Sequence, residues 1–229
     1  MHDFSKLEKQ LQIDFKNKDL LLQAFVHRSY LNENPDLRVG HNERLEFLGD
    51  AVLELVVTEY IFKHYPEKPE GELTTWRAAL VNTKMLSEVS HNLGFEDFLL
   101  LSRGETKEKG KARQYILANT IEAFIGSLYL DRGLRVCQKF ITDYVLSELS
   151  RVLENRLFRD AKSLFQEQAQ EKYGVTPTYG VLKEWGPDHA KGFVVGVFLK
   201  DRKVAEGEGF SKQEAEEEAA RMALEDKRA

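Results

Sequence analysis

The sequence of 229 residues contains a single cysteine, Cys137, and no long uninterrupted apolar run. One cysteine cannot form an intramolecular disulfide or a cysteine-based zinc site, so neither supports this fold. No run approaches the roughly 18 apolar residues that a membrane-spanning helix requires. The first residues also lack the apolar segment of a secretory signal peptide. We therefore expect a cytoplasmic protein that does not contact membranes.

An excess of basic residues is also missing. The chain has 33 Lys and Arg against 38 Asp and Glu, which gives a net charge of −5. From Arg159 onward, 12 basic residues stand against 14 acidic ones, so this part of the chain is not basic either. A protein that binds nucleic acid mainly through phosphates carries a clear positive excess. Any contact with a polyanion must therefore depend on local basic clusters or on bound cations.

Helical periodicity dominates the first two-thirds of the chain, which is long enough for one or two domains. We expect helices over residues 3–11, 19–26, 42–65, 71–93, 113–130 and 134–156. Pro66 and Pro69 end the longest of the early helices, because proline cannot continue a helix. No run in this part shows the alternation of a half-buried strand, so the sequence predicts an all-α domain at 1–155.

The pattern changes after Arg159. A helix predicted over 161–173 is followed by three runs rich in β-branched and aromatic residues, at 178–185, 193–199 and 203–209. Ser211 with Glu214 three residues later has the spacing of a capping box and predicts a last helix. We therefore expect a short linker at 156–159 and then a small α+β domain of order α-β-β-β-α at 160–229.

A file of carboxylates runs along one side of the predicted helix 42–65. At about 100° per residue, this side carries Glu43, Glu46, Asp50 and Glu54, and the opposite, core face carries Leu45, Leu48, Val52, Leu55 and Val56. Like charges repel at this spacing, and a solvated face normally interleaves Lys or Arg with the acids. From the spacing alone, a solvated acidic face and a functional site explain the file equally well.

Two neighbours of the file favour a functional site. Gly49 costs about 1 kcal/mol inside a helix relative to alanine, which indicates that another group approaches closely there. Phe47 lies beside the carboxylates and away from the core face. It therefore either contacts a partner chain or lies under a second helix of the same chain, and the helical geometry favours neither.

The predicted helix 113–130 has a similar division. Its core face carries Leu117, Ile121, Phe124 and Leu128, and its opposite stripe carries Tyr115, Asn119, Glu122 and Gly126. If the two polar stripes face each other, oxygen atoms from Glu46, Asp50, Asn119 and Glu122 converge. Ligands of this kind, without Cys or His, suit Mg²⁺ or Mn²⁺. Such a site can activate water for attack on a phosphodiester.

These residues resemble the signature of bacterial ribonuclease III, which reads NERLEFLGDAVL at residues 42–53. Residues 24–30, 69–73, 80–82 and 116–131 fit the same family. The α-β-β-β-α segment resembles a double-stranded-RNA-binding domain, with its motifs at 186–191 and 211–216. The resemblance covers nearly the whole chain, in the family's domain order.

The resemblance implies a homodimeric, Mg²⁺-dependent endoribonuclease of double-stranded RNA, with Mn²⁺ able to replace Mg²⁺ and with roles in rRNA and mRNA processing. Its products are 5′-phosphate and 3′-hydroxyl ends with two-nucleotide 3′ overhangs. The resemblance implies that the metal ligands are Glu46, Asp50, Asn119 and Glu122. The implied catalytic residues are Asp50 and Glu122, with Glu43 and Glu72 lining the cleavage site. Phe47 matches the aromatic residue of the family's dimer interface. For Glu72 a simpler explanation exists, because the helix dipole favours an acid in a first helical turn.

One position departs from the family pattern, which usually has Asp where this chain has Asn119. An amide provides one neutral oxygen, so the site loses a negative charge and we expect it to bind Mg²⁺ more weakly. The alternative is a cleavage-impaired regulator that binds double-stranded RNA. A phosphohydrolase of small substrates is a third hypothesis, but it leaves the C-terminal domain unexplained.

The resemblance also implies an RNA-binding surface on the second domain. A-form RNA is recognised through 2′-hydroxyls and phosphates, which requires uncharged polar contacts as well as basic ones. The implied minor-groove contacts are Gln166, Glu167, Gln170 and His189. The implied phosphate contacts are Lys191 and, at the start of the last helix, Ser211 and Lys212. Taken alone, the two glutamines are ordinary solvated helix residues and His189 is a turn residue.

Overall fold

The computed structural model describes residues 3–107, 109–154, 161–186 and 191–225. The chain divides into two compact units, Met1–Phe158 and Arg159–Ala229. The predicted linker at 156–159 lies outside the described residues. Within the described part, no helix is both long enough and apolar enough to cross a membrane.

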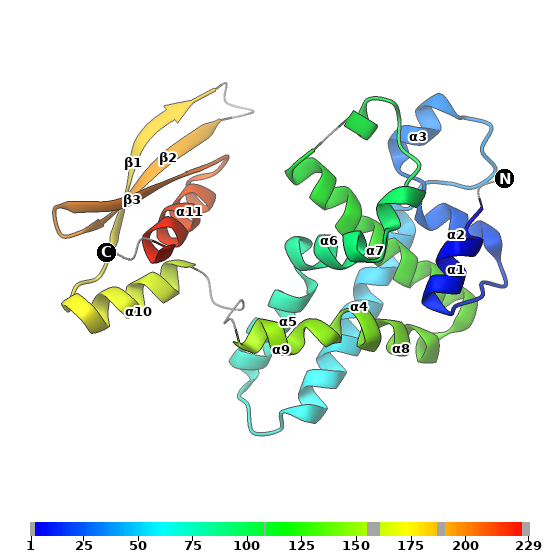
Figure 1. The fold of residues 1–229 in the computed structure, drawn as a ribbon, viewed down its shortest axis with the longest axis horizontal. Coiled ribbons are helices and arrows are strands. Elements are labelled where there is room, and N and C mark those ends of the chain that lie inside the picture. Colours follow the sequence, from blue (N-terminus) through cyan, green and yellow to red (C-terminus); the bar gives the residue numbers. More distant parts are fainter. Residues whose placement is uncertain (1–2, 108, 155–160, 187–190, 226–229) are drawn as a thin grey trace. The chain divides into compact units, whose positions relative to one another are not determined.

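The first unit is built from helices (Figure 1). They are α1 (Ser5–Leu11), α2 (Lys18–Ala24), α3 (Arg28–Glu33), α4 (Glu43–His64), α5 (Glu70–Val81), α6 (Thr83–Asn92), α7 (Lys111–Arg132), α8 (Leu134–Tyr144) and α9 (Leu149–Glu154), with short 3₁₀ turns η1 (Phe95–Phe98), η2 (Glu105–Lys107) and η3 (Leu146–Glu148). Helix α7 lies at the centre of the core. Its Phe124 ring is fully buried and packs against the rings of four other phenylalanines, Phe15, Phe25, Phe95 and Phe140.

Three helical predictions need correction. The helix expected over 71–93 is two helices, because Asn82 adopts an extended conformation (ψ 158°) and its side chain accepts a hydrogen bond from the Met85 N–H, which starts α6. The helix expected over 134–156 is interrupted after Tyr144 by η3. Helix α3 was not predicted at all. It has no buried residue, so it lacks the apolar periodicity on which the prediction depended.

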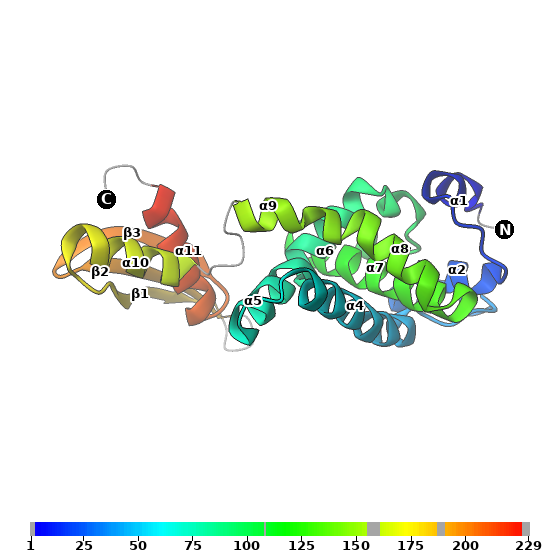
Figure 2. The same cartoon turned by 90° about the horizontal axis from the view of Figure 1, so that it is seen from below.

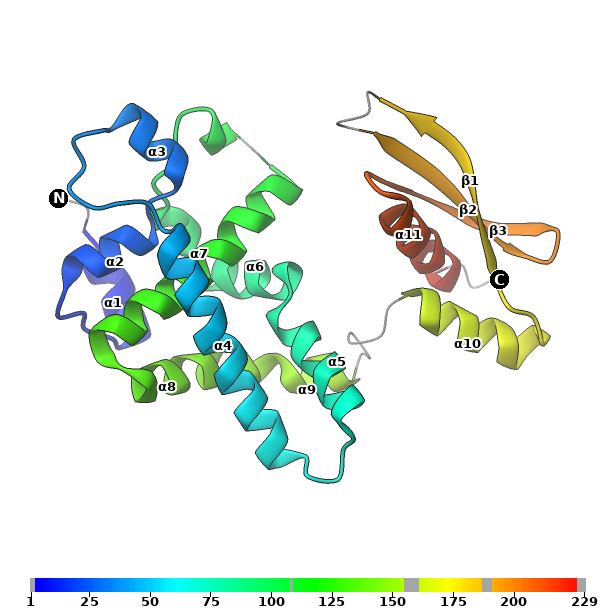
Figure 3. The ribbon, with the colours of Figure 1, turned by 180° about the vertical axis from the view of Figure 1, so that it is seen from behind.

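Helices α4 and α7 cross at unusually short range, and the views in Figures 2 and 3 both show them side by side. A Cβ added to Gly49 would lie 1.7 Å from the backbone oxygen of Glu122. A Cβ added to Gly126 would lie 2.1 Å from the backbone oxygen of Leu45. The group that the sequence predicted to lie close to Gly49 is therefore α7. Each helix contributes one glycine to the contact.

The second unit contains α10 (Ala161–Tyr173), β1 (Thr178–Trp185), β2 (Gly192–Leu199), β3 (Arg202–Gly209) and α11 (Lys212–Glu225). The strands form an antiparallel sheet in the order β1-β2-β3. Both helices contribute to the core that covers one face of this sheet, which contains Phe165, Val197, Ala219, Ala220 and Ala223 (Figure 1). The α-β-β-β-α order, the all-α first domain and the strand positions predicted from the sequence are confirmed.

The glycine contact between α4 and α7 yields a direct prediction. We expect Gly49→Ala to lower the free energy of unfolding by about 1–3 kcal/mol, because the added methyl group collides with backbone that cannot rotate away. The matched control is Gly71→Ala in α5, where an added Cβ has nothing within 4 Å. Alanine should be neutral there, or stabilising by up to about 1 kcal/mol. Urea unfolding measures both variants, and equal stability of the two would contradict the close approach.

Candidate active site

The crossing of α4 and α7 brings four of the sequence-predicted site residues together. The Asn119 side chain is hydrogen-bonded to the carboxylate of Glu46. Glu122, one turn further along α7, lies close enough to Asp50 and Glu46 for both charges to act on its carboxyl group. The two polar stripes therefore face each other, and the glycine contact sets the distance between them.

The electrostatics of this cluster are unfavourable for its own charges. Burial, and then the charges of Asp50 and Glu46, raise the pKa of Glu122 to about 8. Burial and the charge of Glu43 raise the pKa of Glu46, while the hydrogen bond with Asn119 acts in the opposite direction. Carboxyl groups that are held together against repulsion are neutralised either by protons or by a cation.

The donor set fits a hard divalent cation, because all four side chains offer oxygen and the cation would relieve their repulsion. The cluster is not arranged as a finished metal cage, since no group of three or more His, Cys, Asp or Glu among the described residues is positioned to hold an ion. Asn119 is one reason why the cluster is not a complete metal site. Its amide donates a hydrogen bond to Glu46, so part of the oxygen surface is used within the protein.

The other two predicted cleavage-site residues differ from each other. Glu43 begins α4 beside the cluster, and its charge acts on Glu46. Its carboxylate lies 3.6 Å from Arg28 and 3.7 Å from His41. Glu72 lies exposed in the first turn of α5 and pairs with Lys68 at 3.1 Å. This position agrees with the simpler explanation for Glu72, an acid at a helix N-terminus.

Arg28 and His41 were not predicted as site residues. Arg28 begins α3 and His41 precedes α4, so no helical periodicity connects them with Glu43. Two signals were available, because Arg28 lies in the segment 24–30 that fits the family pattern and His41 lies just before the acidic file. The contact of both residues with Glu43 depends on the tertiary fold, and the Arg28 guanidinium places positive charge at the edge of an otherwise acidic cluster.

The side chain of Phe47 is 82% exposed. The alternative in which a second helix of the same chain covers Phe47 is therefore wrong. Leu55 and Phe62 are also exposed and lie on the same side of α4 as Phe47 at 100° per residue. The assignment of Leu55 to the core face is thus wrong as well. Helix α4 carries an apolar stripe, Phe47, Leu55 and Phe62, that is open to solvent.

In the second unit, the three predicted minor-groove residues of α10 lie on one exposed surface. Gln166, Glu167 and Gln170 line a shallow open pocket with two other residues of the same helix. Ser211 caps α11, with its hydroxyl accepting from the Glu214 N–H at 3.1 Å, while the Glu214 carboxylate accepts from the Phe210 N–H at 2.9 Å. The capping box is confirmed in this form. His189 lies outside the described residues.

The two predicted phosphate contacts of basic character lie near each other although 21 positions separate them in the sequence. The ammonium groups of Lys191 and Lys212 lie 2.6 Å and 3.9 Å from the carboxylate of Glu184. This acid was not predicted, because it belongs to β1 and the sheet brings it to the lysines.

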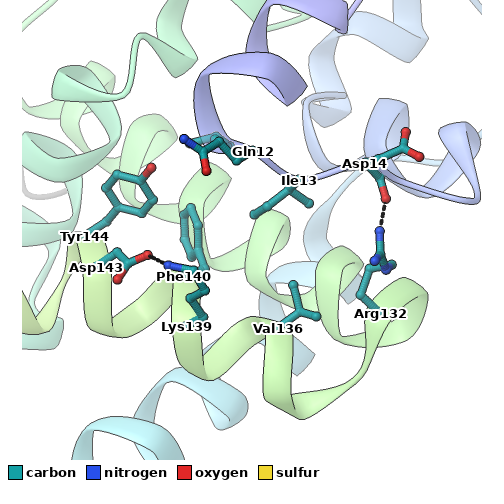
Figure 4. Close-up of a pocket in the computed structure, with 10 residues that line it drawn as sticks. Gln12, Ile13, Asp14, Arg132, Val136, Lys139, Phe140, Asp143 and Tyr144 are labelled. Carbon is teal, nitrogen blue, oxygen red and sulfur yellow. Dashed lines mark hydrogen bonds and ion pairs between the residues drawn. The ribbon is translucent and has the colours of Figure 1, made fainter.

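Another pocket of the first unit, between α8 and the segment after α1, contains none of the predicted site residues (Figure 4). Arg132 donates a hydrogen bond to the backbone oxygen of Asp14, and Lys139 pairs with Asp143 at 2.5 Å. Because its charges are satisfied within the wall, this pocket does not compete with the acidic cluster as the candidate site.

The raised pKa of Glu122 predicts how the stability of the metal-free protein depends on pH. The unfolded chain releases this proton near pH 4.5 and the folded chain holds it to about pH 8. The contribution of Glu122 to the free energy of unfolding should therefore fall as pH rises between these values, by at most about 1.4 kcal/mol per pH unit. Urea unfolding in EDTA should show that Glu122→Gln removes this decline. The exposed Glu54→Gln serves as the control, and parallel profiles for wild type and Glu122→Gln would contradict the prediction.

Comparisons with known proteins identify the family of each unit. Residues 17–149 match the family model described as Ribonuclease-III-like, and residues 161–227 match the double-stranded RNA binding motif. The chain is 42% identical to Ribonuclease 3 of Borreliella burgdorferi over 96% of this chain and 89% of that protein. It is 43% identical to Ribonuclease 3 of Streptococcus thermophilus, over 96% of both chains.

A solved structure is similar to the first unit. It is the nuclease domain of ribonuclease III from Campylobacter jejuni, described in connection with flexibility of a region involved in dimer formation. The two are 39% identical with a TM-score of 0.57, over 62% of this chain and 96% of that one. With matches to both units, in the same order, the chain belongs to the ribonuclease III family.

Proposed function

We propose that this chain is a double-stranded-RNA-specific endoribonuclease whose cleavage centre is the acidic cluster between α4 and α7. A hydrolase of this family depends on a divalent metal ion. The observation that carries the proposal is the set of opposed carboxylates, in which Asp50 and Glu46 act on the half-buried Glu122. A structural core gains nothing from such repulsion, whereas a metal-dependent centre that cuts phosphodiesters uses converging carboxylates to bind its cation.

The residue roles follow from position. Glu46, Asp50, Asn119 and Glu122 would hold Mg²⁺, for which Mn²⁺ is the expected substitute. When bound, this ion supplies an activated water and neutralises charge that develops on the phosphate. Asp50 and Glu122 are the proposed catalytic pair. Glu43 would line the cleavage site, with Arg28 and His41 beside its carboxylate at the edge of the cluster. Glu72 has the weakest support, because its observed partner is Lys68.

The second unit supplies the choice of duplex RNA. We assign the nuclease domain to 1–155 and the RNA-binding domain to 160–229. Gln166, Glu167 and Gln170 would contact the minor groove, whose 2′-hydroxyls suit uncharged and acceptor groups. Lys191, Lys212 and the start of α11 at Ser211 would contact phosphates. His189 is proposed from the sequence resemblance alone. The expected cut ends, the roles in rRNA and mRNA processing and the cytoplasmic location stay predictions of the sequence.

We also propose that the enzyme acts as a homodimer through α4. The exposed stripe Phe47, Leu55 and Phe62 would be covered if two copies packed α4 against α4 about a twofold axis. Phe47→Asp should then yield monomers in light scattering. The matched control is Phe210→Asp in the other unit, which alters a similarly exposed phenylalanine and should leave the mass unchanged. A dimeric Phe47→Asp variant would contradict this interface.

The amide at position 119 gives the sharpest test of the function. We expect Asn119→Asp to lower the Mg²⁺ concentration needed for half-maximal cleavage of a long RNA duplex, because the new carboxylate adds charge and no longer donates a hydrogen bond to Glu46. Gel analysis of a metal titration measures this shift. Asp50→Asn, which removes charge from the facing helix, should shift the titration in the opposite direction or abolish cleavage.

The same titration separates the enzyme from the regulator. A wild-type chain that binds duplex RNA and yields no product at any Mg²⁺ concentration, while Asn119→Asp cleaves, would establish the regulator. Unchanged cleavage curves for Asn119→Asp and Asp50→Asn would contradict the proposed metal centre.

A further inference from the structure

Two lysines of the second unit meet at one acidic side chain. The Lys191 ammonium, just before β2, lies 2.6 Å from Glu184 Oε2, and the Lys212 ammonium, in the first turn of α11, lies 3.9 Å from Glu184 Oε1. Both ammonium groups also lie over the ring of Phe193, at 5.8 Å and 5.7 Å from its centroid. Glu184 and Phe193 therefore gather both cations on one small area of the surface.

The two lysines are not equally available. Lys191 is within hydrogen-bond distance of Glu184, and this bond is the main reason why the pKa of Glu184 is lowered. The carboxylate thus stays ionised and remains paired. Lys212 is farther from Glu184, and its side chain is 60% exposed against 39% for Lys191. An incoming phosphate therefore meets one ammonium group in a long, more exposed ion pair and one held in a close, hydrogen-bonded pair.

We propose that Glu184 limits the affinity of this enzyme for double-stranded RNA by neutralising Lys191, so that Lys212 alone makes a full phosphate contact at this place. The inference rests on the proposed function, because it takes both lysines as the groups that face phosphate. Limited affinity suits an enzyme that must release a cut duplex, since product release limits many turnover rates. Glu184 acts on the affinity for RNA through Lys191 and does not touch the reacting atoms.

The test is the charge-removing variant Glu184→Gln in the full chain, with duplex RNA longer than about 16 base pairs, the length that a double-stranded-RNA-binding domain covers. EDTA prevents cleavage, and binding is measured over a range of salt concentrations. We expect a dissociation constant several-fold lower at low salt, because Lys191 becomes available to a phosphate. The slope of log affinity against log salt should steepen by about one phosphate contact.

Two variants show whether the gain belongs to Lys191. Glu206→Gln makes the same change in net charge, but its carboxylate pairs with Lys203 at 2.8 Å on β3, away from the proposed phosphate contacts. It should bind as the wild type does. Adding Lys191→Gln to Glu184→Gln should return the salt slope to the wild-type value. Melting temperatures equal to that of the wild type show that each variant is folded, and Glu184→Ala provides a second charge-removing variant.

The outcomes separate the inference from the function on which it rests. Glu184→Gln that binds no more tightly than wild type, or Glu206→Gln that gains as much, would overturn the role of Glu184. Lys212→Gln tests the surface itself and should weaken binding. If Lys212→Gln leaves the affinity unchanged, the proposed phosphate contacts are wrong. If Lys212→Gln weakens binding and Glu184→Gln does not tighten it, only the role of Glu184 fails.

Discussion

The close approach of α4 and α7 is the constraint on which the first unit depends. Gly49 and Gly126 each lie against the backbone of the opposite helix, so neither position has room for a methyl group. Helices normally pack with their axes 8–10 Å apart, and the lower part of this range requires small side chains at the contact. Here the small residues allow carboxylates on both sides of the contact to reach each other. The same two glycines thus support the core and define the site.

A site built in this way holds charges that repel each other. The folded core supplies the necessary stability, since the Phe124 ring and its four aromatic neighbours anchor α7 from the side opposite to the acids. The second unit shows the same principle on a smaller scale, because Phe193 and Glu184 gather two lysines that would otherwise repel. Under the proposed function, these two clusters would bind the cations and the phosphates through which an acidic chain acts on RNA.

Local patterns in the sequence predict much of this arrangement. Helix α4 and its acidic file follow from a period of 3.6 residues, and Gly49 inside a helix predicts a close neighbour. The capping box at Ser211 follows from residue types at fixed spacing. These features depend on neighbours in the sequence, so the sequence contains the information.

Features that depend on tertiary contacts could not be predicted in the same way. Asn82 breaks a helix whose apolar pattern continues across it. Leu55 fits the periodicity of the core face of α4, but the fold leaves its side chain exposed. The partners of Glu43 and the meeting of Lys191 with Lys212 at Glu184 come from segments far apart in the sequence. No local pattern encodes such a meeting. For the same reason, the sequence could not show that Asp50 and Glu122 face each other, because this depends on how α4 and α7 cross.

The central claim is that the carboxylates on α4 and α7 jointly bind a divalent ion. Anomalous diffraction from crystals soaked in Mn²⁺ tests it most directly. We expect an anomalous peak between Asp50 and Glu122, within coordination distance of an oxygen from each helix, and loss of that peak in Glu122→Gln. A peak elsewhere would contradict the claim. So would the absence of a peak at saturating Mn²⁺, with the Asp50 and Glu122 side chains hydrogen-bonded to each other.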